Sequence, residues 1–335
     1  MAKMLRTALV MHPVVRDELI RDDHMERLAR AVDLVSPEPV RSFDVLGVEL
    51  GRIEVLITSW GAPPVGPEVI ERMPKLKLIA HLAGSVKGFL DDIVWRRGIL
   101  VTNAVAANAV PVAEYTLAAI LFANKKVLQL NRAYLAAREN RAPWAREAPD
   151  VGNYRKTVGI VGASQVGRLV IRHLRAFDLD VLLYDPYVPP LAARDMRVSK
   201  VTLSELLARS DVVSLHAPLL PETRHMLGSR ELALMPDGAT LINTARGALV
   251  DPAALEAELA RGRLFAVLDT TEPEVLPPDS PLYGLPNVFL TPHIAGSLGR
   301  ETQRLADYIV AEVERFARGV SLKHLVRREL LPRLA

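Results

Sequence analysis

The chain contains 335 residues, of which 50% are apolar and 24% are charged, and its formal net charge is +3. This length favours about two folded domains. Lys and Arg are scattered among acidic residues, so the composition argues against a nucleic-acid partner and against a membrane surface. The sequence contains no cysteine, which excludes disulfides, thiolate nucleophiles and Cys-ligated zinc. We therefore expect no metal, and we expect a cytoplasmic protein, since a reducing compartment suits this composition.

No segment predicts secretion or membrane insertion. The apolar run at the N-terminus stops at His12 and Pro13, which is too short for a signal peptide. The longest apolar stretch near the middle, residues 115–123, is well below the ~20 residues that span a bilayer. The sequence predicts a soluble protein.

The first third of the chain alternates apolar strands with helical patterns. Strands are expected near residues 6–11, 54–58 and 77–82. Residues 110–140 follow as one long helix, apolar on nearly every side at its start, which is typical of a helix buried against another domain or subunit. Residues 141–150 contain two Pro and two Arg and predict a loop.

The second part repeats the alternation more regularly. Six strands are expected, at residues 157–162, 179–185, 211–216, 239–245, 264–269 and 287–291. Continuously apolar strands separated by helices indicate an α/β fold with a parallel sheet that is covered on both faces. A further helical stretch follows residue 300.

A glycine-containing turn follows the first of these six strands. In the pattern G-x-G-x-x-G the first glycine permits a tight turn, the second allows the backbone to approach a pyrophosphate, and the third lets helix pack on strand. Gly162 and Gly167 occupy the first and third positions, and Ser164 replaces the second glycine. The Ser164 hydroxyl can donate a hydrogen bond to a phosphate, which would offset the lost clearance. The motif alone is weak, but the strand before it and the helix after it favour a dinucleotide site.

An acidic residue ends the next expected strand. Asp185 lies 23 residues after Gly162, where a carboxylate can bind the ribose hydroxyls of the adenosine. The same carboxylate repels a 2′-phosphate, so the sequence favours NAD over NADP. The alternative is that Asp185 is only a turn residue before Pro186.

Polar residues gather at the ends of three successive strands in the second half. Arg246 follows one strand, Asp269 ends the next and precedes Glu272 and Glu274, and His293 follows the last. Open α/β sheets bind ligands at the carboxyl ends of their strands. Beside a nicotinamide, this set suits hydride transfer between a 2-hydroxy acid and a 2-oxo acid. Arginine binds the carboxylate and carbonyl, histidine exchanges the hydroxyl proton, and a carboxylate orients the histidine.

Four separated motifs now make the chain resemble the D-isomer-specific 2-hydroxyacid dehydrogenases over nearly its whole length. They are "VAEYTLAAIL" (112–121), "HAPLLPETRHML" (216–227), "LINTARGALVDPAAL" (241–255) and "VLDTTEPEVLPPDSPLYGLPNVFLTPHIAG" (267–296). The resemblance implies a Rossmann-type doubly wound NAD-binding domain, residues 108–300. It is inserted into a smaller flavodoxin-like α/β substrate-binding domain, residues 1–107 plus 301–335. It also implies a homodimer formed through the region 112–138.

The resemblance assigns roles to individual residues. Arg246, Glu274 and His293 match the catalytic arginine, the histidine-paired acid and the acid–base, and Asp269 resembles the residue that holds the nicotinamide carboxamide. The residues expected to bind the cofactor are Gly162, Ser164, Gln165, Val166, Gly167, Asp185, His216, Ala217, Pro218, Thr223, Thr244, Ala245, Arg246, Asp269, His293, Ala295 and Gly296. Those expected to bind the substrate are Gly84, Ser85, Val86, Arg246 and His293. The family spacing favours Glu274 over Glu272, but the sequence does not show which one faces His293.

The chain also departs from the family. Lys87 stands where an acidic residue is usual, and "AVAAN" (104–108) lacks the usual Pro and Gly. Backbone N–H groups around Gly84 to Val86 would still bind a carboxylate. Lys87 either favours a bulkier or second anionic group or points to solvent. The alternative function is an NAD(H)-sensing regulatory protein similar to the corepressors of this family. The catalytic residues favour the enzyme.

Overall fold

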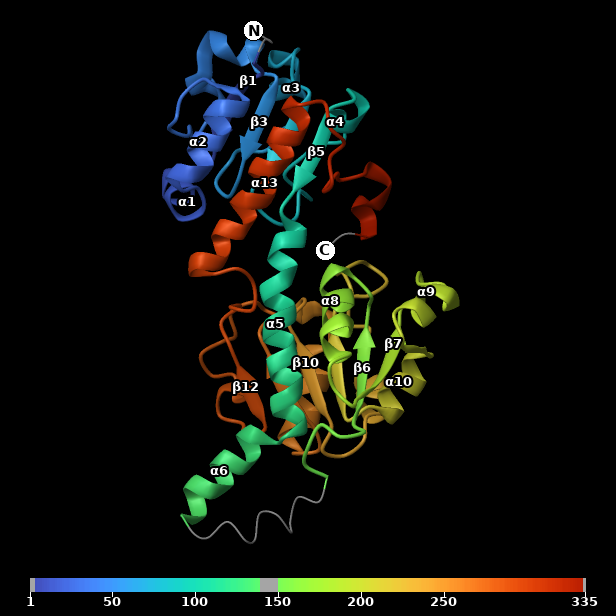
Figure 1. Cartoon of the computed structure of the whole chain (residues 1–335). Coiled ribbons are helices and arrows are strands. Elements are labelled where there is room, and N and C mark those ends of the chain that lie inside the picture. The colour runs from blue at the N-terminus through green and yellow to red at the C-terminus, as the bar shows by residue number, and fades with distance from the viewer. Residues whose placement is uncertain (1–3, 139–149, 334–335) are drawn as a thin grey trace. The chain divides into compact units, whose positions relative to one another are not determined.

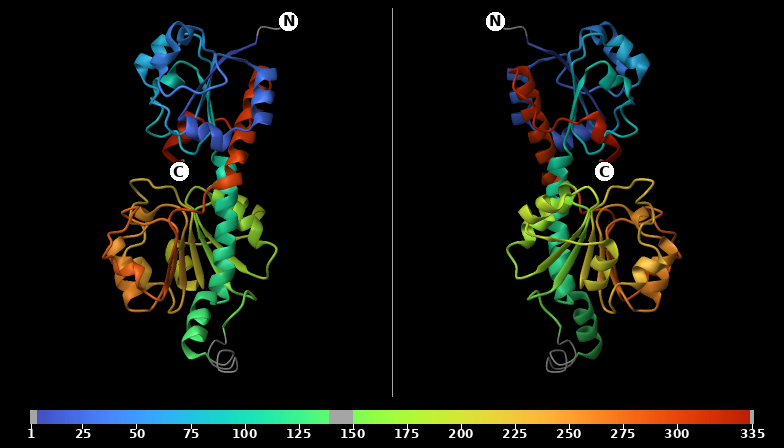
Figure 2. Two further views of the ribbon diagram at one scale, coloured as in Figure 1. Left: turned by 90° about the vertical axis from the view of Figure 1, so that its left-hand side faces the viewer. Right: turned by 90° about the vertical axis from the view of Figure 1, so that its right-hand side faces the viewer.

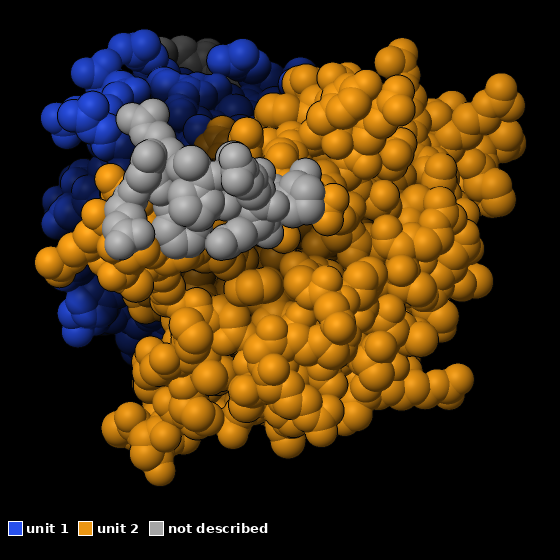
Figure 3. Space-filling model, turned by 90° about the horizontal axis from the view of Figure 1, so that it is seen from below, with its two compact units in different colours: residues 1–108, 297–334 blue, residues 109–296, 335 orange. Residues whose placement is uncertain are grey.

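The computed structural model describes residues 4–138 and 150–333, which form two compact units (Figures 1 and 3). Unit 1 runs to Asn108 and resumes at Ser297, and unit 2 extends from Ala109 to Gly296. The expected boundaries were 107/108 and 300/301. The expected loop at residues 141–150 falls outside the described residues, apart from Asp150.

Unit 1 contains a five-stranded parallel sheet. Its strands are β1 (Arg6–Val10), β2 (Asp33–Leu34), β3 (Val55–Thr58), β4 (Leu78–His81) and β5 (Leu100–Asn103), in the order β2-β1-β3-β4-β5. This order is that of flavodoxin-like folds and confirms the expected fold class. Strands β2 and β5 were not predicted from the sequence.

The helices of unit 1 are α1 (Pro13–Leu19), α2 (Asp22–Ala31), α3 (Pro67–Arg72), α4 (Ile93–Arg96) and α13 (Thr302–Ala317), with 3-10 helices η1 (Phe43–Arg52), η4 (Gly299–Glu301) and η5 (Arg328–Arg333). Leu305, Ile309 and Val313 of α13 recur on one helical face and are buried in the same core as the strand residues Val55 and Leu78. The segment after unit 2 therefore completes the core of unit 1.

Unit 2 contains a seven-stranded parallel sheet, one strand more than expected. The strands are β6 (Thr157–Val161), β7 (Asp180–Tyr184), β8 (Ser199–Lys200), β9 (Val212–Leu215), β10 (Thr240–Asn243), β11 (Phe265–Leu268) and β12 (Val288–Leu290), in the order β12-β11-β10-β9-β6-β7-β8. The chain reverses direction across the sheet between β6 and β9, as in doubly wound Rossmann-type sheets.

Helices lie on both faces of this sheet (Figure 2). They are α8 (Gln165–Leu174), α9 (Pro190–Asp195), α10 (Leu203–Arg209), α11 (Ser229–Ala233) and α12 (Pro252–Ala260), with the 3-10 helices η2 (Gly247–Leu249) and η3 (Pro281–Tyr283). Two separate apolar clusters, one around Val213 and Leu241 and one around Ile160 and Ile242, pack these helices on the sheet. Strands that are apolar on both faces require this arrangement, which confirms the α/β prediction.

The prediction of a single helix over residues 110–140 is wrong. Helix α5 (Val105–Asn124) ends at a break, and a second helix, α6 (Val127–Ala137), follows. Lys126 between them has a φ of 49°, a left-handed conformation that ends the regular helical hydrogen bonding. Phe122 is 56% exposed in the single chain, so burial of this segment against another domain or subunit stays a prediction.

Helix α5 is long and apolar enough to cross a membrane by length and composition alone. The core helix of a water-soluble domain meets the same criterion. Ala113 and Ile120 are fully buried in the apolar cluster that also contains Ile160 of β6, so one face of α5 belongs to the core of unit 2.

Candidate functional site

The turn between β6 and α8 can be built only with glycine at two positions. Gly162 has a φ of 96°, and a Cβ there would lie 2.6 Å from the backbone nitrogen of Ala217. A Cβ on Gly167 would lie 2.1 Å from the carbonyl oxygen of Gly162. The first and third glycines thus give the tight turn and the close helix–strand packing of a dinucleotide loop. Helix α8 is ten residues long, and its first N–H groups, those of Gln165 and Val166 among them, have no partner within the helix. Such a loop suits the pyrophosphate of NAD.

Ser164 serves as the N-cap of α8. Its Oγ accepts a hydrogen bond of 3.4 Å from the N–H of Gly167, which gives one of the orphan donors of the first turn a partner. The hydroxyl proton is still available as a donor, so capping is compatible with a contact to phosphate. Ser164, which replaces the second glycine of the motif, therefore has a local structural role in addition to any role in binding.

Asp185 lies beside the same loop, just after β7. Its Oδ2 accepts a hydrogen bond of 2.7 Å from the N–H of Ala163, and its Oδ1 accepts one of 2.8 Å from the N–H of Tyr187. A carboxylate has about four acceptor positions. Two are used by the backbone, so Asp185 both stabilises the loop and keeps the capacity to accept hydrogen bonds from ribose hydroxyls.

His216 lies under the nucleotide loop, because the backbone of His216 and Ala217 is what a side chain at Gly162 would strike. Its side chain is 3% exposed, and Nε2 lies 2.9 Å from Oγ of Ser214. Burial lowers the pKa of His216 from 6.5 to about 3. The imidazole is thus a neutral core group. Any contact that His216 makes with a cofactor comes from its backbone.

Thr223 is also used within its own loop. Its Oγ1 accepts a hydrogen bond of 2.8 Å from the N–H of Leu220 and donates one of 2.6 Å to the carbonyl of Pro218. The two hydrogen bonds hold the segment that follows β9. Ala217 is buried, whereas Pro218 is partly exposed.

Arg246 lies three residues beyond β10 and is exposed. Its Nη1 donates to the carbonyl of Ala245 at 2.7 Å, and Ala245 in turn donates to Oδ1 of Asn243 at 3.1 Å. The buried Thr244 bonds through Oγ1 to Oγ1 of Thr116 on α5 at 2.9 Å. Thr116 was not predicted from the sequence, because a threonine within an apolar helix gives no local signal of a polar partner.

Asp269, directly after β11, is 2% exposed, and its carboxylate accepts three hydrogen bonds. The donors are Oγ1 of Thr291 at 2.6 Å and the N–H groups of Ile294 at 2.8 Å and Ala295 at 2.9 Å. Most of the acceptor capacity of this carboxylate is therefore used to shape the turn after β12. His293 in that turn has a φ of 55°, which costs energy in a residue other than glycine and persists only when neighbouring contacts hold it.

His293 and Glu274 form a direct pair. Nδ1 of His293 lies 2.5 Å from Oε1 of Glu274, and both side chains are about half exposed. Glu272 makes other contacts: its Oε2 lies 2.7 Å from Nε2 of His225, and its Oε1 bonds to Arg224. The structure therefore answers the question that the spacing left open, because Glu274 and not Glu272 meets His293.

The expected site residues of unit 2 thus lie along one edge of its sheet. Strands β10, β11 and β12 are neighbours and parallel, so Arg246, Glu274 and His293 follow adjacent carboxyl ends. The nucleotide loop follows β6 at the same edge, and Gly296 closes the unit just after the histidine turn. Within residues 4–138 and 150–333, no group of three or more potential ligands could hold a metal ion.

Gly84, Ser85 and Val86 lie in unit 1, in the loop that follows β4. Oγ of Ser85 accepts a hydrogen bond of 3.3 Å from the N–H of Lys87, and the Lys87 side chain is exposed. The buried His81 stacks on Phe89 with ring centroids 4.9 Å apart, so the loop rests on an aromatic pair. Burial lowers the pKa of His81 from 6.5 to about 4.

Comparisons with known proteins show the family to which the chain belongs. Residues 117–295 match the family model described as "D-isomer specific 2-hydroxyacid dehydrogenase, NAD binding domain". The chain is 36% identical to a D-3-phosphoglycerate dehydrogenase of Methanocaldococcus jannaschii over 83% of its length, but covers 52% of that relative. It is 35% identical to a glyoxylate reductase of Korarchaeum cryptofilum, covering 80% of this chain and 81% of the relative. The chain spans about half the length of most of these curated relatives.

The fold also matches solved structures. A phosphoglycerate oxidoreductase from Rhizobium etli aligns with a TM-score of 0.81 at 25% identity, covering 97% of this chain and 99% of that one. The aligned region includes residues of both units.

Proposed function

Because the chain belongs to the D-isomer specific 2-hydroxyacid dehydrogenase family and contains its NAD-binding domain, we propose that it interconverts a D-2-hydroxy acid and the corresponding 2-oxo acid. The observation that carries the proposal is the pair formed by Nδ1 of His293 and Oε1 of Glu274 at 2.5 Å. This pair lies at the same edge of the sheet as Arg246 and the nucleotide loop, and the combination suits a dehydrogenase.

His293 is the proposed acid–base. Since Nδ1 is bonded to Glu274, Nε2 is the nitrogen that exchanges a proton with the substrate oxygen. The carboxylate of Glu274 orients the ring and stabilises its protonated form, which donates the proton during reduction of the 2-oxo acid. The nicotinamide, when bound, supplies or accepts the hydride.

Arg246 is the proposed anchor for the substrate carboxylate and carbonyl. A guanidinium binds two oxygens at once and is charged at every physiological pH, which a lysine cannot match in geometry. Its only intramolecular side-chain bond among the described contacts uses Nη1, so the rest of the fork is available for a ligand.

We assign cofactor binding to unit 2, which also supplies Arg246 and His293, and we assign further substrate contacts to unit 1. The loop at Gly84, Ser85 and Val86 offers backbone N–H groups to a carboxylate, and the exposed Lys87 next to it suits a second anionic group. Among the relatives, the phosphoglycerate dehydrogenases act on such a doubly anionic acid and the glyoxylate reductase on a small one. Both classes are candidates for the substrate of this chain.

The test is a panel of 2-oxo acids with NADH consumption as the readout. Glyoxylate, hydroxypyruvate and its phosphate ester, pyruvate, and branched and aromatic 2-oxo acids are included. We expect turnover of at least one acid and its loss by about 10²-fold or more in His293→Ala. A blank panel combined with tight NADH binding would favour the sensor alternative, and wild-type turnover in His293→Ala would refute the acid–base assignment.

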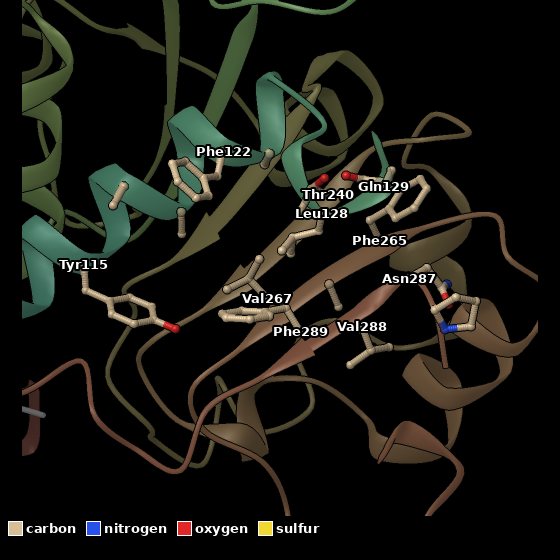
Figure 4. A pocket seen from close by; sticks show the side chains of 15 residues that line it. Tyr115, Phe122, Leu128, Gln129, Thr240, Phe265, Val267, Asn287, Val288 and Phe289 are labelled. Atoms are coloured by element: carbon tan, nitrogen blue, oxygen red, sulfur yellow. The ribbon is translucent and has the colours of Figure 1, made fainter. Parts of the chain in front are cut away.

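We also propose that the protein is a homodimer through the region of α5 and α6. An apolar pocket of about 230 Å³ lies between the α5–α6 corner and the edge of the sheet (Figure 4). Tyr115, Phe122, Leu128 and Phe289 are among its lining residues, and Phe122 and Phe289 are 56% and 40% exposed. Exposed aromatic surface of this kind is typical of an interface between subunits. The test compares the oligomeric state of the wild type with that of Phe122→Glu by sedimentation. A monomeric wild type would refute the proposed dimer.

A further inference from the structure

The loop between β11 and η3 carries two glutamates that face different partners. Glu274 meets His293, whereas Glu272, two residues earlier, meets His225 and Arg224. The side chain of Glu272 is 25% exposed and that of Glu274 is 56% exposed, so Glu272 is the better enclosed of the two. The hydrogen bond from His225 is the main cause that holds the pKa of Glu272 below its ordinary value, with Arg224 acting in the same direction. Glu272 is therefore an ionised anchor of the loop.

The partners of Glu272 connect this loop to the segment that carries Arg246. The N–H of His225 donates to the carbonyl of Ala248 at 2.8 Å, within η2 immediately after Arg246. Leu227, two residues further along, donates to the carbonyl of Leu249 at 3.2 Å. The backbone of His225 thus bonds to the segment that follows Arg246, and its ring bonds to Glu272 in the loop that carries Glu274.

A direct backbone contact also joins the segment after Arg246 to the loop that carries the two glutamates. A Cβ on Gly247 would lie 2.0 Å from the carbonyl carbon of Thr271, so the residue after Arg246 packs against the residue before Glu272 without space for a side chain. Asp251 Oδ2 lies 4.0 Å from Nδ1 of His225 and adds a second acid next to the ring. The loop of Glu274 is consequently held at one point by backbone packing and at a second by the ion pair of Glu272.

We propose that Glu272, through His225 and Arg224, is a positioning residue for catalysis, which holds the loop so that Glu274 stays in contact with His293. This inference rests on the proposed function. Glu272 touches neither His293 nor Arg246 in the described contacts, and it acts through Glu274. The ion pair of Glu272 with His225 can hold the loop in place, because Glu272 belongs to the loop and the backbone of His225 is bonded to the segment after Arg246.

The test combines two substitutions in a double-mutant cycle. Glu272→Gln retains the shape of the side chain and removes its charge. We expect kcat to fall about tenfold with KM for NADH unchanged, since the loop moves and the nucleotide loop does not. In a Glu274→Gln background the same substitution should cause almost no further loss, because the residue it positions is already disabled. Equal losses in both backgrounds, or wild-type kcat in Glu272→Gln, would overturn the proposal.

Two controls keep the outcome interpretable. Glu205→Gln removes another ion-paired glutamate of the same unit, which bonds to Arg209 of α10, and should leave kcat unchanged. His225→Gln removes the other half of the pair and should reproduce the effect of Glu272→Gln, which keeps the test available if one variant fails to fold. If Glu272→Gln and His225→Gln both lower the melting temperature, and their losses of kcat add to that of Glu274→Gln, the role of Glu272 is purely structural. That result would also overturn the proposal.

A readout without turnover separates this inference from the proposed function. The imidazole resonance of His293, identified by its loss in His293→Ala, should shift in Glu272→Gln and not in Glu205→Gln. A shift together with a blank panel of 2-oxo acids would support the role of Glu272 in holding Glu274 against His293 and would refute the dehydrogenase. Turnover of a 2-oxo acid by the wild type would support the dehydrogenase. An unshifted resonance and an unchanged kcat in Glu272→Gln would then overturn the positioning role.

Discussion

His216 makes the stability of unit 2 depend on pH in a calculable way. The folded chain keeps this buried imidazole neutral, with a pKa of about 3, whereas an unfolded chain protonates it with the ordinary value of 6.5. Because the folded pKa is the lower one, the stabilisation is fully present above pH 6.5 and is lost as the pH falls from there toward 3. His216→Asn retains a polar partner for Ser214 and removes the titrating group.

The magnitude follows from the difference in proton binding. One pKa unit corresponds to about 1.4 kcal/mol, so lowering the pH from about 7.5 to about 5 should reduce the free energy of unfolding through His216 by about 2 kcal/mol. The assay is urea unfolding followed by circular dichroism at both pH values. His216→Asn should lose about 2 kcal/mol less than the wild type between the two values, whatever its stability at neutral pH.

A matched variant tests whether the effect belongs to unit 2. His81 in unit 1 is buried as well, with a pKa of about 4, so His81→Asn should flatten the pH dependence in the same direction. If the two units unfold separately, each variant should change only its own transition. Identical pH dependence in the wild type and in His216→Asn would refute the reasoning, because it would mean that the folded state binds the proton as readily as the unfolded chain.

Three further predictions concern the site. Arg246→Lys should lose about 2 kcal/mol of transition-state stabilisation, measured as kcat/KM, because a bidentate contact becomes a point charge; an unchanged kcat/KM would exclude Arg246 from substrate binding. The wild type should prefer NADH to NADPH in steady-state kinetics, since the carboxylate of Asp185 repels a 2′-phosphate; a preference for NADPH would contradict the ribose argument. Ser164→Gly should bind NADH at least as tightly in a fluorescence titration and lose only a few tenths of a kcal/mol of stability, because it frees the N–H of Gly167 and glycine is a tolerable N-cap. A large loss of affinity would instead show that the hydroxyl is a required phosphate ligand.

Much of unit 2 could be predicted from sequence because its strands are continuously apolar and its turns carry strong local signals. Each of the six expected strands contains an observed one, and the parallel arrangement follows from the helices between them. The strands that were missed are β2 and β8, two residues each, and β5, which begins with the exposed Leu100. Short strands at sheet edges owe their form to a neighbour's hydrogen bonds, and no local pattern marks them.

The break at Lys126 shows the same limit for helices. The residues on either side of it favour helix, and Lys is a good helix former, so propensity predicts no interruption. The left-handed φ of 49° at Lys126 is a property of the folded chain. The long uniform helix was therefore a reasonable interpretation of the sequence and an incorrect one.

For the site, the sequence alone determined which residues reach the carboxyl edge of the sheet. Arg246, Asp269 and His293 each end or follow a strand, and strands of a parallel sheet all end on one side, so their proximity follows from the fold class. The family spacing favoured Glu274, but only the tertiary structure showed that it meets His293, because no local property of the sequence distinguishes two acids two residues apart. The path of the loop, fixed by Gly247 against Thr271 and by the pair of Glu272 with His225, turns Glu274 toward the imidazole. Contacts between segments distant in sequence set such a path, and they exist only once the chain has folded.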